Sequence, residues 1–129
     1  MDDLKKIVKE IERSVNDCFE SDVDIYECNG YYKTSSFEIQ DVGDFDSDND
    51  LGLDAEVTIE HGGRWLDYED DGPEFDYEQH IKDVILRVHD GNTGEYVAQT
   101  EWMSFGNLWS LARKGQQPKF YKTQKDERN

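Results

Sequence analysis

The chain has 129 residues with 31 acidic and 14 basic side chains, a net charge of -17, which excludes direct binding to the phosphate backbone of nucleic acid and to anionic lipid. Its length predicts one domain whose core needs no disulfide or metal. Three Trp, seven Tyr and six Phe argue against a disordered chain, although 35% of the residues are charged.

Negative charge is concentrated in the middle of the chain. Residues 14–101 carry 25 acids and only four bases, whereas residues 102–129 carry two acids and six bases. Like charges held together on a folded surface repel each other, so we expect such a surface to attract a partner of opposite charge. The domain prediction is a single acidic unit over residues 1–115, followed by a basic tail over 116–129 that frays.

The sequence favours the cytoplasm of a bacterial host cell. The N-terminus has no basic region followed by an apolar stretch, as a signal peptide would, and no apolar run approaches the roughly 20 residues of a membrane span. Cys18 and Cys28 are the two cysteines. Cys18 falls on the apolar stripe of the first predicted helix, which indicates a buried free thiol and a reducing compartment.

The first predicted element is an amphipathic helix that ends at Ser21 and Asp22. Asp2 and Asp3 stand at its start, where the helix dipole favours acids. Apolar residues recur at the three- and four-residue spacing of one helix face: Leu4, Ile7, Val8, Ile11, Val15, Cys18 and Phe19.

An antiparallel sheet is predicted to follow. A first strand over 23–26 and a return strand over 31–42 flank Asn29-Gly30, a strong hairpin signal. Residues 44–50 are predicted to form an acidic loop. The strand over 51–60 has the clearest pattern in the chain, because Leu51, Leu53, Ala55, Val57 and Ile59 alternate with Asp54, Glu56, Thr58 and Glu60.

The second half is predicted to contain a turn at Gly62-Gly63 and a second acidic loop over 67–78. Strands over 81–89 and 95–103 form a hairpin around residues 90–94. A short helix then begins after its cap Ser104 and ends at Gly115; beyond it, Phe120 and Tyr121 dock on the body.

These elements predict the α+β class. The expected architecture is an N-terminal helix, an antiparallel sheet of about four or five strands, and a short C-terminal helix.

No residue pattern points to catalysis, a cofactor or a metal. Asp44, Asp46, Asp48 and Asp50 alternate as at the start of a calcium loop, but neither register supplies the glycine and the glutamate that the motif requires, and the flanks are predicted strands. The three histidines share no ligand spacing, and His61 falls on the apolar side of its strand. We therefore do not expect an enzyme.

The surface of the sheet carries the functional signal. Asp54, Glu56 and Glu60 point to one face of their strand, and Glu38 extends the array sideways. Alternate residues of a strand lie roughly 6.6 Å apart, close to the spacing of successive phosphates along a nucleic-acid backbone. Such carboxylates meet the same Lys and Arg side chains that bind DNA, although a solvated sheet face of an acidic protein would have the same pattern.

The second acidic segment combines acids with Trp65, Tyr68, Phe75 and Tyr77, as interfaces with aromatic anchors do. The alternative is that Trp65 and Phe75 pin this segment to the core. The complete set of predicted partner-binding residues comprises the acids of both loops, the outward acids of the central strand and one tyrosine: Asp44, Asp46, Asp48, Asp50, Asp54, Glu56, Glu60, Asp67, Tyr68, Glu69, Asp70, Asp71, Glu74 and Asp76.

The chain resembles the small acidic DNA-mimic inhibitors of phages and plasmids, which include anti-CRISPR and antirestriction proteins. The resemblance lies in size, net charge, and acidic strands and loops over a small α+β core. The hairpin from Val84 through Val97, followed by a helix, is similar to part of a small acidic Cas9 inhibitor. The resemblance implies a basic partner protein that binds nucleic acid, such as a CRISPR effector or a restriction enzyme, with Cas9 as the first choice. The chain would bind this partner as a monomer or a homodimer. The basic tail departs from the class.

Two other functions stay open. An immunity protein or antitoxin that caps a basic toxin nuclease would need the same charge. A calcium-dependent module would use residues 44–54.

Overall fold

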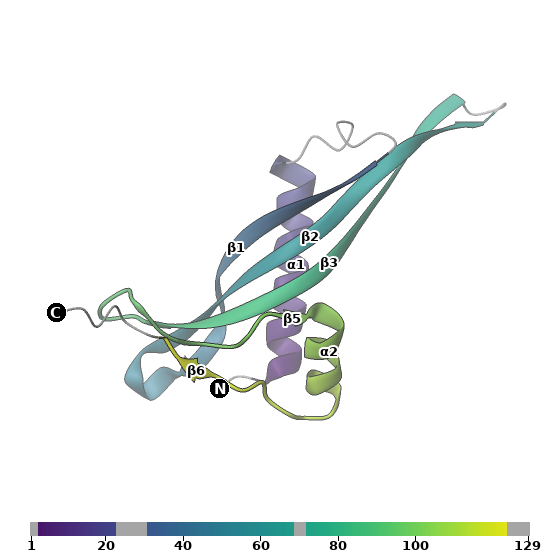
Figure 1. Ribbon diagram of the computed structural model, residues 1–129. Helices are drawn as coiled ribbons and strands as arrows, with labels where there is room; N and C mark the ends of the chain where they lie inside the picture. Colours follow the sequence, from purple (N-terminus) through teal and green to yellow (C-terminus); the bar gives the residue numbers. More distant parts are fainter. Residues whose placement is uncertain (1–2, 23–30, 69–71, 124–129) are drawn as a thin grey trace.

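The computed structural model describes residues 3–22, 31–68 and 72–123. Two helices cover one face of an antiparallel sheet, so the fold is α+β as predicted (Figure 1). The predicted strand over 23–26 and its hairpin turn at Asn29-Gly30 lie outside the described residues.

The sheet has the strand order β1-β2-β3-β4-β6, with β5 pairing beside β3. The three long strands β1, β2 and β3 lie side by side with β1 at one end of this order, and every described pair of strands is antiparallel. The strands along the main path are β1 (Tyr31–Asp46), β2 (Leu51–Tyr68), β3 (Gly72–Asp90), β4 (Tyr96–Gln99) and β6 (Tyr121–Lys122).

Helix α1 (Leu4–Asp22) packs on the sheet through the predicted apolar stripe. Its residues Leu4, Ile7, Val8, Ile11 and Val15 are buried in the same cluster as the inward residues of β2 and β3. The core therefore lies between α1 and the sheet, which positions the opposite face of the sheet towards solvent.

The predicted acidic loop over 44–50 is wrong in its extent. Strand β1 continues to Asp46, and a single 3-10 turn, η2 (Ser47–Asn49), leads into β2. The pairing of Asp44 with Gly52 and of Asp46 with Leu51 holds the end of β1 in the sheet. Backbone pairing to a hydrophobic strand thus outweighs the low strand propensity of aspartate.

The predicted turn at Gly62-Gly63 is also wrong, and so is the predicted loop over 67–78 in its described residues, 67–68 and 72–78. Strand β2 passes through both glycines, which pair with β1 on one side and with β3 on the other. The hairpin continues to the pair Tyr68–Gly72. Pro73 is tolerated because it stands at the start of β3, where a missing amide donor costs little.

A bulge at Lys82 changes which residues of β3 face the core. Ile81 pairs with Ile59 and Asp83 pairs with Thr58, so Lys82 has no opposite residue. One extra residue reverses the alternation of a strand. Val84, Leu86 and Val88 face the core on one side of the bulge, and Gln79 and Ile81 face the helices on the other side.

The predicted hairpin around residues 90–94 is confirmed, but the strand predicted over 95–103 is divided into β4 and β5 (Met103–Ser104), after which α2 (Phe105–Arg113) begins. As predicted, the Ser104 side chain caps α2 by accepting a hydrogen bond from the Asn107 amide at 3.1 Å. The helix ends at Arg113, two residues before the predicted end, and Gly115 turns the chain away with a positive φ of 67° that suits glycine.

The fraying predicted for the tail is wrong up to Thr123. Tyr121 and Lys122 pair with β4, and the Thr123 amide donates to the Val97 carbonyl at 3.2 Å. The predicted docking of Phe120 is confirmed, because its ring lies 5.0 Å from that of Phe45. The apolar contact and the added strand together hold this segment, although most of its residues are polar or basic.

Thr100, which lies between β4 and β5, connects this segment to β3 through its side chain. Its hydroxyl accepts a hydrogen bond from the Leu86 amide at 3.1 Å and donates one to the Glu101 carbonyl at 2.9 Å, and the residue is buried.

We expect Thr100→Val to lower the free energy of unfolding by about 1–3 kcal/mol, because the Leu86 amide loses its acceptor. Urea unfolding checks this, and Thr100→Ser, which keeps the hydroxyl, should retain most of the stability.

Candidate functional site

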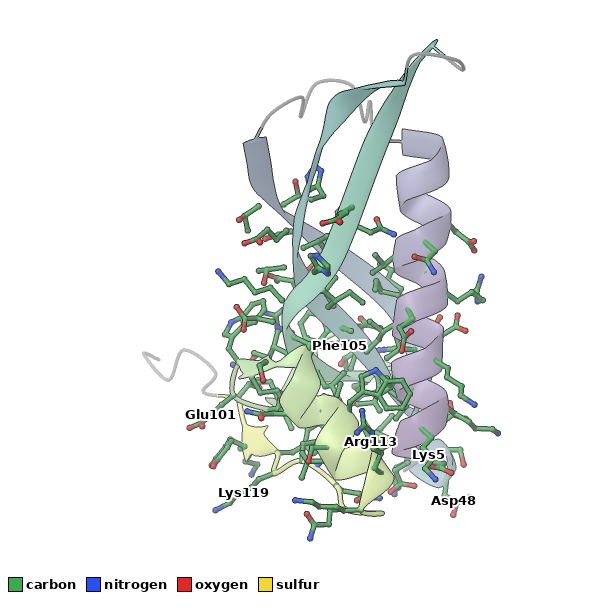
Figure 2. All side chains as sticks on the ribbon, turned by 90° about the vertical axis from the view of Figure 1, so that its right-hand side faces the viewer. Lys5, Asp48, Glu101, Phe105, Arg113 and Lys119 are labelled. Atoms are coloured by element: carbon green, nitrogen blue, oxygen red, sulfur yellow. The ribbon has the colours of Figure 1, made fainter. Side chains whose placement is uncertain are left out.

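The open face of the sheet is the candidate site, and we call it the outer face. Asp54, Glu56 and Glu60 of β2 point to it, since Leu53, Ala55, Val57 and Ile59 between and beside them are buried on the helix side. Glu38 of β1 pairs directly with Glu56. The predicted rows of carboxylates on neighbouring strands are therefore present, with α1 and α2 on the opposite side of the sheet (Figure 2).

Arg87 of β3 supplies positive charge in the middle of the outer face. One of its guanidinium nitrogens, Nη1, lies 2.8 Å from Glu56 Oε1, and the two side chains are only 20% and 24% exposed. The guanidinium also lies 5.9 Å from the centre of the Tyr96 ring. Directly opposed like charges destabilise a sheet. The ion pair between Arg87 and Glu56 therefore offsets the repulsion between Glu38 and Glu56.

Asp54 accepts hydrogen bonds from two other strands and lies beside His89 of a third. Its Oδ2 accepts a hydrogen bond from the Tyr96 hydroxyl at 2.9 Å, and its Oδ1 accepts one from the Asp41 amide at 3.0 Å. The Nδ1 atom of His89 lies 3.2 Å from the same Oδ1, and the Asp54 side chain is 13% exposed. Asp54 and Glu56 are therefore fixed within the surface, whereas Glu38 is exposed.

The bulge in β1 explains the contact between Asp41 and Asp54. The register shifts between Ile39 and Gly43, and Asp41 adopts a positive φ of 56°. Because the extra residues leave the Asp41 amide without a strand partner, the carboxylate of Asp54 takes that place. Nothing in the sequence of β1 predicts this contact, since a bulge has no strict residue requirement.

Asp41, Asp54 and His89 also form a group that could hold a metal ion. One ligand atom from each residue lies within 4.8 Å of the others, and imidazole with carboxylates suits several divalent metals. The two hydrogen bonds of Asp54 account for the position of Asp54, whereas His89 Nδ1 is buried and has no hydrogen-bond partner among the described residues. Sequence reasoning missed the group because its members lie on three different strands and share no spacing along the chain.

Two acidic turns lie together at one end of the outer face. The Gly91 amide donates to the Asp50 carbonyl at 2.8 Å, which joins η2 to the turn after β3. A Cβ atom at Gly91 would lie 2.5 Å from Asp50 Oδ2, so any other residue there would displace the Asp50 side chain. Asp44, Asp48 and Asp50 are exposed, and Asp46 is half-buried and accepts a hydrogen bond from the Asn49 side chain at 2.6 Å.

The second predicted acidic segment lies at the other end of β2 (Figure 1). Asp67, Tyr68, Glu74 and Asp76 belong to the paired part of the β2–β3 hairpin. Residues 69–71, which hold Glu69, Asp70 and Asp71, lie outside the described residues. The structure therefore separates the two predicted acidic clusters by the full length of the strand.

The structural role predicted for His61 is confirmed. Its side chain is buried on the helix side of β2, and its Nε2 lies 2.9 Å from the hydroxyl oxygen of Ser35. His80 is exposed and lies 3.9 Å from a carboxylate oxygen of Glu78. The three histidines thus occupy three separate environments.

The basic residues near the C-terminus do not pair with the acidic face in the described part of the chain. Arg113 lies 5.8 Å from the centre of the Trp109 ring, and Lys119 lies 5.3 Å from that of Tyr121.

No protein-family profile, curated protein or solved structure matches this chain. Neither described helix combines the length and the apolar character that crossing a membrane requires.

Removing either partner of the Arg87–Glu56 ion pair should destabilise the protein. We expect Arg87→Met to lower the free energy of unfolding by about 1–3 kcal/mol, because Glu56 then faces Glu38 without a positive charge. The double variant Arg87→Met/Glu56→Gln should recover part of this loss. Urea unfolding of the two single variants and the double variant measures the coupling, and additive losses would contradict it.

Desolvation, followed by the hydrogen bond and the negative charge of Asp54, raises the pKa of Tyr96 above 10.0. A raised pKa of an acid stabilises the fold at lower pH, and this stability is lost as the pH rises through the folded-state value. We expect Asp54→Asn to lower the pKa of Tyr96, as measured by NMR titration of labelled tyrosine rings. Glu60→Gln is the control; an equal shift there would contradict a specific effect of Asp54.

Proposed function

We propose that this chain is an acidic DNA-mimic inhibitor that occupies the nucleic-acid-binding cleft of a host defence nuclease. An anti-CRISPR role is the first choice, with Cas9 as the expected target, and antirestriction is the second. The observation that carries the proposal is the outer face, where carboxylates on rigid paired strands lie on one side of a sheet whose other side is covered by helices.

Internal contacts give the outer face its rigidity. Tyr96 and the Asp41 amide hold Asp54, and Arg87 holds Glu56. Side chains that are already ordered lose little conformational freedom on binding, which favours affinity. A DNA mimic needs this property, because the binding groups of a nuclease cleft are arranged for phosphates at defined positions.

The contacts with the partner are assigned mainly to the more accessible acids. Glu38 is exposed, Glu60 is partly exposed, and Asp41 presents a side chain that is 83% exposed. Asp54 and Glu56 contribute charge and hold the surface in shape, which refines the role predicted for them from sequence. Arg87 is a departure from a uniform anionic surface, and its guanidinium is largely covered by its neighbours.

We assign to the acidic turns and to the net charge the role of speeding the association with the partner. Asp44, Asp46, Asp48 and Asp50 extend the negative charge beyond the end of the sheet. Charge of this kind attracts a basic cleft from a distance and raises the association rate, and salt weakens this effect steeply. The predicted members of the second segment, at the other end of β2, would extend the anionic surface lengthwise.

Affinity capture from nuclease-treated bacterial lysate, with and without expressed Cas9 and guide RNA, tests the proposal. We expect the tagged protein to retain one DNA-binding nuclease, and we expect its release by target DNA and by high salt. Retention of a toxin nuclease would instead favour the immunity-protein function. A salt-insensitive mixture of basic proteins would contradict specific mimicry.

Neutral substitutions on the outer face should weaken the captured complex. We expect Glu38→Gln/Glu60→Gln to reduce affinity by about tenfold at low salt, with a smaller effect at high salt, because rim charges act mainly through association. The control variant Glu10→Gln/Asp17→Asn makes the same change in net charge on α1. Equal losses from both variants, measured by surface plasmon resonance on folded proteins, would contradict an interface on the outer face.

A further inference from the structure

Three large aromatic side chains are exposed in the described part of the chain, on or next to the short strands β4, β5 and β6. They are Tyr96 (38% exposed), Trp102 (45%) and Tyr121 (43%), and we call them the aromatic patch. Exposed rings keep apolar area in contact with water, and several of them on one face of a protein mark an interaction surface. The question is therefore which face they share.

Strand pairing places both tyrosines of the patch on the outer face. The hydroxyl of Tyr96 donates to Asp54, and its ring lies beside the guanidinium of Arg87. Tyr121 pairs with Gln99, whose Oε1 accepts a hydrogen bond from Arg87 Nε at 3.4 Å. Residues directly opposite each other in an antiparallel pair point to the same side of the sheet, so Tyr121 lies on the side of Gln99 and Arg87.

The third ring, Trp102, lies on the same face. Met103, which follows it, pairs with Val84 and packs against the core, so the alternation of side chains places Trp102 on the outer side. Ile85, which follows Val84, is 3% exposed although it does not belong to the core cluster. The outer face thus holds apolar surface of its own beside the rows of carboxylates.

Acidic residues lie close to Trp102 in the chain and in the sheet. Glu101, its neighbour in the chain, is exposed and lies on the side of the molecule away from α1 (Figure 2). Asp83 of β3 pairs with Ser104, two residues after Trp102, and therefore shares its face. The carboxylate of Asp83 is half-buried, with Oδ2 at 3.5 Å from the Thr58 hydroxyl.

Arg87 shows how the outer face holds a guanidinium group. Its Nη1 lies 2.8 Å from Glu56 Oε1, and its guanidinium lies 5.9 Å from the centre of the Tyr96 ring. A guanidinium makes both contacts at once because it is planar, with N–H donors at its edge and faces that stack on rings, whereas an ammonium is a compact charge. Trp102 also lies among acids, but no described residue makes a cation–π contact with its indole.

We propose that the aromatic patch anchors arginine side chains of the basic partner on the outer face. This inference rests on the proposed function and deepens it, because it extends the interface from the acids of β1 and β2 to β4, β5 and β6. Charge complementarity selects a basic protein, and an open indole among carboxylates favours arginine over lysine. The acids then act on the association rate, and Trp102 acts on the dissociation rate, as aromatic anchors of interfaces do.

NMR titration of the full-length ¹⁵N-labelled protein with two peptides tests the inference without the nuclease. The probes are nona-arginine and nona-lysine, which have the same charge and differ in the cationic group. At physiological ionic strength we expect nona-arginine to bind about threefold more tightly, because the guanidinium stacks on the indole. The signal of the Trp102 indole N–H should shift more than that of Trp109, which lies on the helix side.

Two matched substitutions distinguish the aromatic patch from the general attraction of an acidic protein. Trp102→Leu should abolish the preference for nona-arginine, because the remaining acids attract both peptides through charge alone. Trp109→Leu makes the same change on α2, where the ring lies beside Arg113, and should keep the preference. Neither substitution changes the net charge, and circular dichroism checks that both variants are folded.

With the nuclease obtained by affinity capture, the two parts of the interface should differ in kinetics. We expect Trp102→Leu to raise the dissociation rate by about tenfold and to leave the association rate nearly unchanged. Glu38→Gln/Glu60→Gln should instead lower the association rate. Surface plasmon resonance measures both rates.

Three results would overturn the inference: equal binding of the two peptides, an unchanged preference for nona-arginine in Trp102→Leu, or a captured complex whose dissociation rate is the same in Trp102→Leu. None of them would contradict the capture of a nuclease. Failure to capture a nuclease would contradict the proposed function instead, and the peptide titration would still decide whether the aromatic patch binds arginine.

Discussion

The structure depends on one constraint, which is that helices cover a single face of the sheet. Alternate residues of β2 must then be apolar and buried or polar and exposed, and the chain uses carboxylates for most of the polar positions. The strands provide rigidity that a disordered acidic segment would lack, because the core side of each strand is packed against α1. The charge is therefore presented on a fixed surface, at the cost of repulsion that Arg87 and Tyr96 reduce locally.

Two bulges decide which side chains reach each face. The bulge in β1 turns the Asp41 amide towards Asp54, and the extra residue Lys82 in β3 reverses the alternation of that strand. As a result Arg87 lies on the outer face, while Gln79 lies on the helix side. The candidate site thus depends on local irregularities of the sheet as well as on its regular part.

The sequence predicts α1, the central strands and the capped helix α2 because each has a clear hydrophobic period or a local signal such as Ser104. It fails at Gly62-Gly63 and in the acidic segment after Asp67, where pairing with neighbouring strands outweighs local propensity. The outward direction of Asp54, Glu56 and Glu60 follows from alternation alone. The contacts that fix them do not, because Arg87, Tyr96 and Asp41 come from other strands through register shifts that leave no pattern in the sequence.

The hairpin of β2 and β3 extends beyond the start of β1, whose first residue pairs with Gly63. Among the described residues, only β2 and β3 pair from there to Tyr68, a reach of roughly 17 Å at the usual rise per residue. A pair of strands is less stable than strands with a third neighbour. Amide hydrogen exchange along β2 should therefore form a gradient, slow where β1 and β3 both pair with β2 and faster towards Tyr68.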